Sequence, residues 1–195
     1  MNALSHEALA TLFLDARSHN GWSDRPVTEE DCRRIYDVAK FGPTSANSSP
    51  ARFVWVTSAE GRARLAECAS DGNKAKIRAA PVTVIIARDP AFHTRMPQLF
   101  PHNEAMQKLF TRPEVAAPTA QRNATLQGAY LMLAARALGF DIGPMSGFDA
   151  DRVNAEFLSE QGWEADWLCS IGHGNGENMF PRLPRLDFAE ACTIV

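Results

Sequence analysis

The sequence predicts a layered fold of class α/β or α+β built around one sheet. Helix-like and strand-like patterns alternate along the chain, with long connections between them. The uninterrupted β-branched run at 82–87 is typical of a strand covered on both faces. The longest helical pattern, 119–138, is apolar around most of its circumference, so we expect it to be buried on more than one side. With 195 residues, the chain suits a single domain, 1–195.

The individual elements follow from their periodicity and their end signals. In the helix at 5–17, apolar residues recur on one face that we expect to be buried. Thr28 and Asp31 form a capping-box pattern at the start of the next helix, whose inner face should include Tyr36. The expected helices are 5–17, 28–41, 59–69, 73–79, 119–138 and 149–157, and the expected strands are 53–57, 82–87 and 167–171.

The segment 88–118 is a long excursion in which prolines recur among apolar residues. Short helices are expected there. Because so long a connection in one domain usually carries function, we interpret it as a lid or substrate-binding excursion. The alternative is a flap that faces a partner and takes no part in chemistry.

Composition argues against several classes of function. The net charge of −3 and the mixed signs of the charged residues give no basic stripe for nucleic acid. No signal peptide or membrane span is recognisable, so we expect a soluble, cytoplasmic protein without a membrane partner. The four cysteines are scattered and the histidines are not clustered, which predicts reduced thiols and no metal site.

Two apparent motifs do not carry their usual chemistry. The glycine-rich run 172–176 follows a strand, but Pro181 and Pro184 stand where a dinucleotide-binding helix would have to begin. Ser146 lies one place late for the nucleophile of a serine hydrolase elbow.

The stretch 41–53 is the strongest candidate for a site. It joins a helix to a strand through hydroxyl and amide residues between Pro43 and Pro50, as a loop for the polar edge of a cofactor would, and as an ordinary connection also can. Further polar and cationic residues fall at element ends. Arginine, lysine and hydroxyl groups of this kind suit a phosphate and an electron-rich heterocycle. They are Arg17, Ser18, Asn73, Lys76, Ser146, Gly147, Arg182 and Arg185.

Taken together, these motifs resemble the flavin-dependent nitroreductase family almost from end to end. The runs 42–52, 143–149 and 182–186, with Trp22, are more narrowly similar to its malonic semialdehyde reductase (RutE-type) branch. The resemblance implies an α+β three-layer fold with a central mixed β-sheet flanked by helices. It also implies an intertwined homodimer that holds FMN in its interface and uses NAD(P)H as co-substrate.

The same resemblance implies roles for individual residues. Arg17, Ser18 and His19 would hold the FMN phosphate or ribityl chain, and a tail arginine, Arg182 or Arg185, would close on the phosphate. Asn73 and Lys76 would reach the ribityl and pyrimidine side. Ser146 and Gly147 would approach flavin N5. The other subunit would supply Pro43, Thr44, Ser45 and Asn47 against the ring.

This chain departs from the family at Asn20, where many relatives have a basic residue, at Ser49-Pro50-Ala51, which lacks an aromatic wall, and at Ser146, which is often acidic. The hypothesis for mechanism is a hydride relay through flavin N5, with no catalytic side chain and with Lys76 tuning the reduced cofactor.

The branch implies reduction of malonic semialdehyde to 3-hydroxypropionate in pyrimidine degradation. An anionic substrate could meet Arg95, His102 or Arg112, although each can equally be a solvated surface group. The alternatives are a broad NAD(P)H nitroreductase, a quinone or enal reductase, and an FMN-binding carrier without activity.

Overall fold

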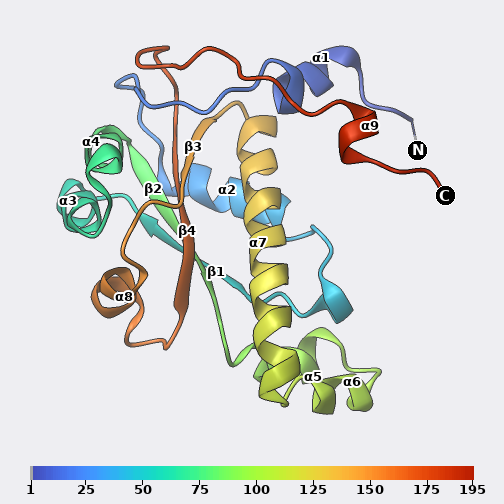
Figure 1. Cartoon of the computed structure of the whole chain (residues 1–195). Helices are drawn as coiled ribbons and strands as arrows, with labels where there is room; N and C mark the ends of the chain where they lie inside the picture. The colour runs from blue at the N-terminus through green and yellow to red at the C-terminus, as the bar shows by residue number, and fades with distance from the viewer. Residues whose placement is uncertain (1) are drawn as a thin grey trace.

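The sheet forms the middle of the molecule (Figure 1). In this computed structural model, which describes residues 2–195, the strands lie in the order β1-β2-β4-β3. Their bounds are β1 Ala51–Val56, β2 Val82–Arg88, β3 Asp141–Met145 and β4 Glu164–Gly172. All three strand pairs are antiparallel, whereas a mixed sheet was expected. The parallel pairing among the described residues is an isolated bridge between Ser18 and Ile142.

Strand β2 explains why both faces of the sheet are covered. Its residues from Val82 to Ala87 are all buried. Val84 and Ile86 enter one apolar cluster and Ile85 and Ala87 enter another, because successive side chains point to opposite faces. The strand predicted at 82–87 is therefore confirmed.

Helices cover each face, so the fold has three layers. α2 (Glu29–Ala39) and α7 (Pro113–Ala137) pack on one face through residues such as Ile35 and Leu131. α3 (Ala59–Glu67), α4 (Asp71–Ala79) and α8 (Ala150–Val153), the last continued by a wide turn at Asn154–Leu158, lie on the other face. The α+β three-layer fold is confirmed.

Local signals place α2 accurately. The Thr28 side chain accepts from the Asp31 amide, and the Asp31 carboxylate accepts from the Thr28 amide, which completes the capping box. Tyr36 was wrongly expected on the inner face. Its side chain is 44% exposed, because the ring packs edge-on against Phe53 beside the sheet edge.

Helix α7 begins earlier than predicted. Pro113 occupies its first turn, where a missing amide hydrogen costs nothing, and Pro118 is accommodated inside the helix. The last residues of the segment 88–118, from Pro113 on, therefore belong to α7. The part before them forms short helices at Phe92–Arg95, Met96–Leu99 (α5) and Glu104–Leu109 (α6). Phe92, Met96 and Phe110 make a small core of their own against the first turns of α7.

The chain ends differ most from expectation. The first helix is a short α1 (His6–Leu9) continued by a wide π-type turn, Ala10–Leu14. No residue of this stretch is buried, and Phe13 and Leu14 are 53% and 52% exposed. The prediction that this helix buries one face is therefore wrong for the single chain. The tail carries α9 (Phe188–Ala191), and residues 177–195 are exposed. Within residues 2–195, no helix has the length and apolarity to cross a bilayer.

Candidate functional site

A groove of about 750 Å³ lies where the N-terminal segment, α4, the end of α7, β3 and the tail meet. Arg17 and Ser18 come from the N-terminal segment, Lys76 comes from α4, and Arg182 and Arg185 come from the tail. The structure therefore brings five of the predicted site residues together. The groove is also lined by Phe13, Leu14, Ala16, Asn20, Arg136, Pro144, Phe180, Pro181 and Leu183.

Backbone pairing fixes Arg17 and Ser18 at this groove. The His19 amide donates to the Ile142 carbonyl over 2.9 Å, and the Ser23 amide donates to the His173 carbonyl over 2.8 Å. Between these bonds, Trp22 is buried beside Gly172, where an added Cβ would lie 2.7 Å from the indole. The segment is thus held along the ends of β3 and β4.

His19, predicted beside Arg17 and Ser18, does not line the groove. Its Nε2 lies 3.3 Å from the Asp141 carboxylate, and its ring packs on Gly174, where a Cβ would lie 1.8 Å from Nδ1. The His19 imidazole therefore holds the N-terminal segment against the sheet, through Asp141 at the start of β3. Ser18 and Asn20, on either side of His19, line the groove, as expected where successive side chains of an extended segment point to opposite sides.

Asn73 and Gly147 form a second contact between distant parts of the chain. The Asn73 Nδ2 donates to the Gly147 carbonyl over 3.0 Å, and the Ser70 amide donates to the same carbonyl over 3.0 Å. A Cβ at Gly147 would lie 2.8 Å from Asn73 Nδ2, so a larger residue there would displace the amide that makes this bond. Asn73 thereby orients the turn that carries Ser146.

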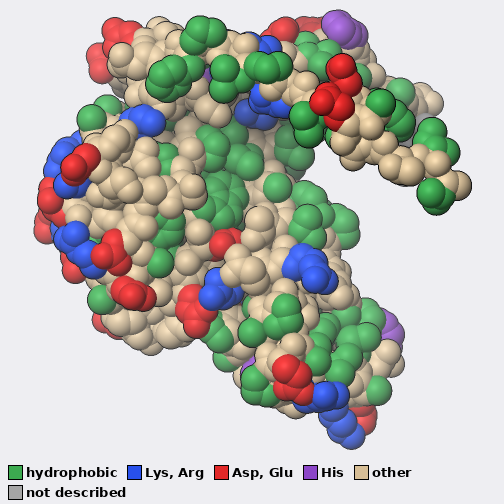
Figure 2. All heavy atoms as spheres, in the orientation of Figure 1, with side chains coloured by type: hydrophobic (Ala, Val, Ile, Leu, Met, Phe, Trp, Pro, Cys, Tyr) green, Lys and Arg blue, Asp and Glu red, His purple; other side chains and the backbone are tan. Residues whose placement is uncertain are grey.

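An apolar hollow of about 480 Å³ adjoins the groove at Pro144, which lines both. Its walls include Ala129 and Met132 of α7 and Met145 and Ser146 at the end of β3. Asp166 lies at its edge and accepts hydrogen bonds from Gln121 over 2.6 Å and from Thr125 over 2.7 Å. Figure 2 shows hydrophobic side chains across the concave face and cationic ones at its upper end beneath the tail.

The lining of the groove is strongly cationic. Five cations line it, Arg17, Lys76, Arg136, Arg182 and Arg185, and no carboxylate is among its lining residues. Burial lowers the pKa of the Arg136 guanidinium, which nevertheless stays protonated as arginines do in proteins. Groove and hollow together suit a ligand with an anionic group at one end and a flat apolar ring at the other.

Arginine side chains of the groove donate hydrogen bonds to backbone carbonyls on its opposite wall. Arg17 donates to the Phe180 carbonyl, and Arg182 donates to the Ala16 carbonyl over 3.2 Å. Arg185 instead donates to tail carbonyls at Leu183 and Pro184. The first two arginines therefore bind the N-terminal segment and the tail to each other.

The loop 43–49 is held in an unusual backbone conformation. Ala46, Asn47 and Ser49 have φ values of 49°, 51° and 42°, which are uncommon for residues other than glycine. The Ser45 amide donates to the buried Asn123 side chain over 2.8 Å, and the Tyr130 hydroxyl donates to the Pro43 carbonyl over 3.0 Å. Such strain persists only where the surroundings impose it, and it is frequent at ligand sites.

This loop and the groove lie on opposite faces of α7. At roughly 100° per residue, Asn123 and Tyr130 face the loop, whereas Ala129, Met132 and Arg136 face the hollow and groove. The structure thus does not bring Pro43, Thr44, Ser45 and Asn47 to the groove of their own chain.

The three residues considered for an anionic substrate do not converge. Arg112 forms an exposed ion pair with Glu114 at 2.7 Å, and His102 packs against the Phe100 ring. Arg95 lines a separate cavity with Tyr36 and Arg52.

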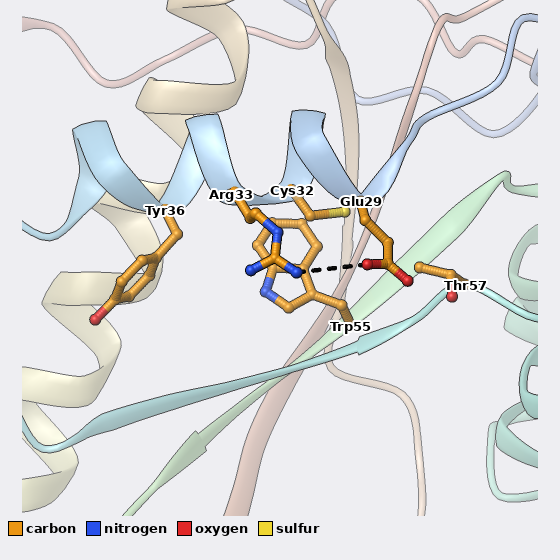
Figure 3. Close-up of a pocket in the computed structure, with 6 residues that line it drawn as sticks. All are labelled: Glu29, Cys32, Arg33, Tyr36, Trp55 and Thr57. Carbon is orange, nitrogen blue, oxygen red and sulfur yellow. Dashed lines mark hydrogen bonds and ion pairs between the residues drawn. The ribbon is translucent and has the colours of Figure 1, made fainter.

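A further cavity of about 340 Å³ lies between α2 and β1 (Figure 3). Figure 3 shows the ion pair between Arg33 and Glu29, whose closest nitrogen and oxygen atoms are 3.5 Å apart. Burial raises the pKa of the nearby Cys32 thiol to about 11, so it is protonated at neutral pH. No predicted site residue lines this cavity, and the described residues contain no cluster suited to a metal ion.

Sequence reasoning missed Arg136, Asp166 and Trp167. Arg136 could have been noticed as a lone cation in the apolar run 131–138. Asp166 and Trp167, which also lines the hollow, carry no such signal, because their place there depends on the pairing of β4.

Comparison with known proteins gives consistent matches. The family model described as "Nitroreductase family" matches residues 14–174. A protein of Rhodopseudomonas palustris (strain TIE-1), provisionally named an NADH dehydrogenase/NAD(P)H nitroreductase, is 50% identical over 187 residues, covering 96% of this chain and 95% of that protein. A similarly named protein of Burkholderia lata is 51% identical over 194 residues, covering 100% of both.

Among solved structures, a provisionally named nitroreductase from Exiguobacterium sibiricum 255-15, in complex with FMN, superposes with a TM-score of 0.87 at 21% identity. The match covers 100% of both chains and establishes the likeness of fold.

Proposed function

Because this chain belongs to the nitroreductase family, we propose that it is an FMN-dependent NAD(P)H oxidoreductase. The observation that carries the proposal is the cationic groove, free of carboxylates in its lining, that opens into an apolar hollow at Pro144. A phosphate monoester fits the first and an isoalloxazine ring fits the second. The names of the relatives and the FMN bound in the Exiguobacterium structure support the same cofactors.

The chain's own groups have distinct tasks in this proposal. Arg17, Ser18, Arg182 and Arg185 bind the phosphate, while Asn73 orients the turn at Ser146 and Gly147 against the ring. When bound, FMN supplies hydride transfer from NAD(P)H to an acceptor. Lys76 places an ammonium group at the pyrimidine edge, which favours added negative charge there and so raises the reduction potential.

We further propose that the enzyme is an intertwined homodimer. The loop 43–49 faces away from the groove of its own chain, so a site that uses both needs a second copy. Apolar residues of the N-terminal stretch and the tail are exposed, and Phe13, Phe180 and Phe188 are each at least 53% exposed. Cavities also follow the edge strand β1 beside Tyr36, where a segment of another chain could add to the sheet.

Segment 88–118 is proposed as the lid of this single FMN-binding domain, 1–195. Ala46 packs against its apolar core, and the Asn47 side chain donates to the Leu99 carbonyl over 2.9 Å. An ion pair of 2.6 Å between Arg52 and Asp89 fixes the base of the segment. The lid therefore supports the loop that meets the second copy's ring.

For the acceptor, we propose malonic semialdehyde, reduced to 3-hydroxypropionate. The support is the set of runs at 143–149 and 182–186 that resemble the RutE-type branch. A nitroaromatic acceptor is the second candidate, favoured by the nitroreductase names of the two relatives. A quinone is a further alternative.

Two experiments test these proposals in turn. Purified protein should be yellow, should bleach under NADH or NADPH without oxygen and should recover its colour on addition of an acceptor. A yellow protein indifferent to both nucleotides would be a carrier, and a colourless one that ignores added FMN would refute the cofactor assignment. Steady-state kcat/KM values with malonic semialdehyde, a nitroaromatic and a quinone then compare acceptors. A ten-fold or greater preference for either of the latter two would overturn the aldehyde assignment.

A further inference from the structure

Arg136 is a cation of the groove that neither the sequence motifs nor the family resemblance identified. It lies in the last turn of α7, between Ala135 and Ala137, and its side chain enters the lining beside Arg17 and Lys76. The other arginines of the groove are carried by the N-terminal segment and the exposed tail. Arg136 is therefore the arginine mounted on a long packed helix.

One hydrogen bond fixes the direction of this side chain. Its Nη1 donates to the Leu12 carbonyl over 2.9 Å, which leaves Nε and Nη2 without a bonded partner in residues 2–195. No ion pair joins Arg136 to a carboxylate within the same residues. Burial is the largest effect on the pKa of this half-buried guanidinium, and the attraction of Asp141, which forms no ion pair with it, does not cancel that effect. An anion in the groove would offset the remaining desolvation penalty.

We propose that Arg136 binds the phosphate of the cofactor directly, as the rigid member of the cationic cluster. The inference rests on the proposed function, since it assumes that FMN occupies the groove. The helix fixes the Arg136 backbone and the Leu12 bond fixes its side chain, so little rotamer freedom is lost when the phosphate binds. Arg17 and Arg182, by contrast, exchange bonds with the tail and the N-terminal backbone.

A purely structural role makes a different prediction. If Arg136 only braces the Leu12 carbonyl, its loss would disturb the groove wall and weaken every ligand of the site alike. A phosphate-binding role affects only ligands that carry the phosphate. Riboflavin has the same ring and ribityl chain as FMN without the phosphate, so the pair separates the two roles.

The test titrates FMN and riboflavin into the full-length protein after removal of bound flavin, with flavin fluorescence as the readout. Wild type is compared with Arg136→Met, Arg136→Lys and the control Arg122→Met, an exposed arginine of the same helix. For Arg136→Met we expect the Kd for FMN to rise by about 10- to 100-fold, as for loss of a charge-assisted hydrogen bond. The Kd for riboflavin should change less than about two-fold, and Arg136→Lys should fall between wild type and Arg136→Met.

The outcomes are distinguishable. Equal weakening of both flavins by Arg136→Met, or no change in either, would overturn the inference while leaving the proposed function intact. A wild-type protein that binds neither flavin would refute the proposed function itself. If Arg136→Met does not fold, Arg136→Lys decides, because it keeps the charge: a raised Kd for FMN alone supports the inference, and any other result contradicts it.

Discussion

Replacing Asn123 by alanine should detach the loop 43–49 from α7. The Asn123 side chain is 3% exposed and makes two hydrogen bonds, accepting from the Ser45 amide and donating to the Thr119 carbonyl, each over 2.8 Å. At about 0.5–1.5 kcal/mol for each bond, the free energy of unfolding should fall by about 1–3 kcal/mol. For a chain of this size that is a fall in Tm of roughly 2–12 °C.

The same variant should bind FMN more weakly, because Ser45 and Asn47 would no longer be held in the conformation that the ring meets. Thermal unfolding and flavin titration measure the two effects. Gln127→Ala is the matched control: Gln127 is 7% exposed and accepts from the Ala51 amide over 2.9 Å, so it holds β1 and not the loop. With one bond where Asn123 has two, it should lose about 0.5–1.5 kcal/mol and keep its affinity for FMN. Equal affinities in the two variants would refute the reasoning.

Three further predictions concern other parts of the molecule. Lys76→Ala should slow reduction of the bound flavin by NAD(P)H in stopped-flow measurements without changing Tm, and an unchanged rate would remove its proposed role. Gly42→Ala should lower stability by about 1–3 kcal/mol, because the new Cβ would lie 2.0 Å from the Tyr130 ring; an unchanged Tm would show that the ring is free to move. Hydrogen bonds from the Thr28 backbone and side chain lower the pKa of Asp31 below its ordinary value of 3.8, so this stabilisation is present above that pH and is lost on acidification. Asp31→Asn should therefore be less stable than wild type in urea at pH 7, and the difference should shrink towards pH 3; a constant difference would contradict the assignment.

Much of the fold could be predicted where the signal is local. The capping box at Thr28 placed the start of α2 correctly, and the β-branched run at 82–87 identified the central strand. Strand β3 was not recognised, because Gly143 and Pro144 interrupt a strand pattern. Pro144 is tolerated there because β3 lies at the sheet edge.

The remaining differences depend on contacts between distant residues. The stretch predicted as a helix at 5–17 does carry apolar residues, but none from His6 to Leu14 is buried by the rest of residues 2–195. His19 was expected at the phosphate but points toward Asp141, because the bridge between Ser18 and Ile142 sets the direction of the side chain that follows Ser18. Arg136 reaches the groove only because α7 ends beside Leu12, a neighbourhood that residue order does not reveal.

Mixing two defective chains tests most directly whether one site is built from two copies. Arg17→Glu damages the groove, and Ser45→Trp fills the space in front of the loop with a bulky ring. Each variant alone should bind little FMN. A heterodimer of the two, isolated with different tags, should regain one flavin, since the intact groove of one chain then faces the intact loop of the other. A heterodimer that binds no more FMN than its parents would contradict the shared site.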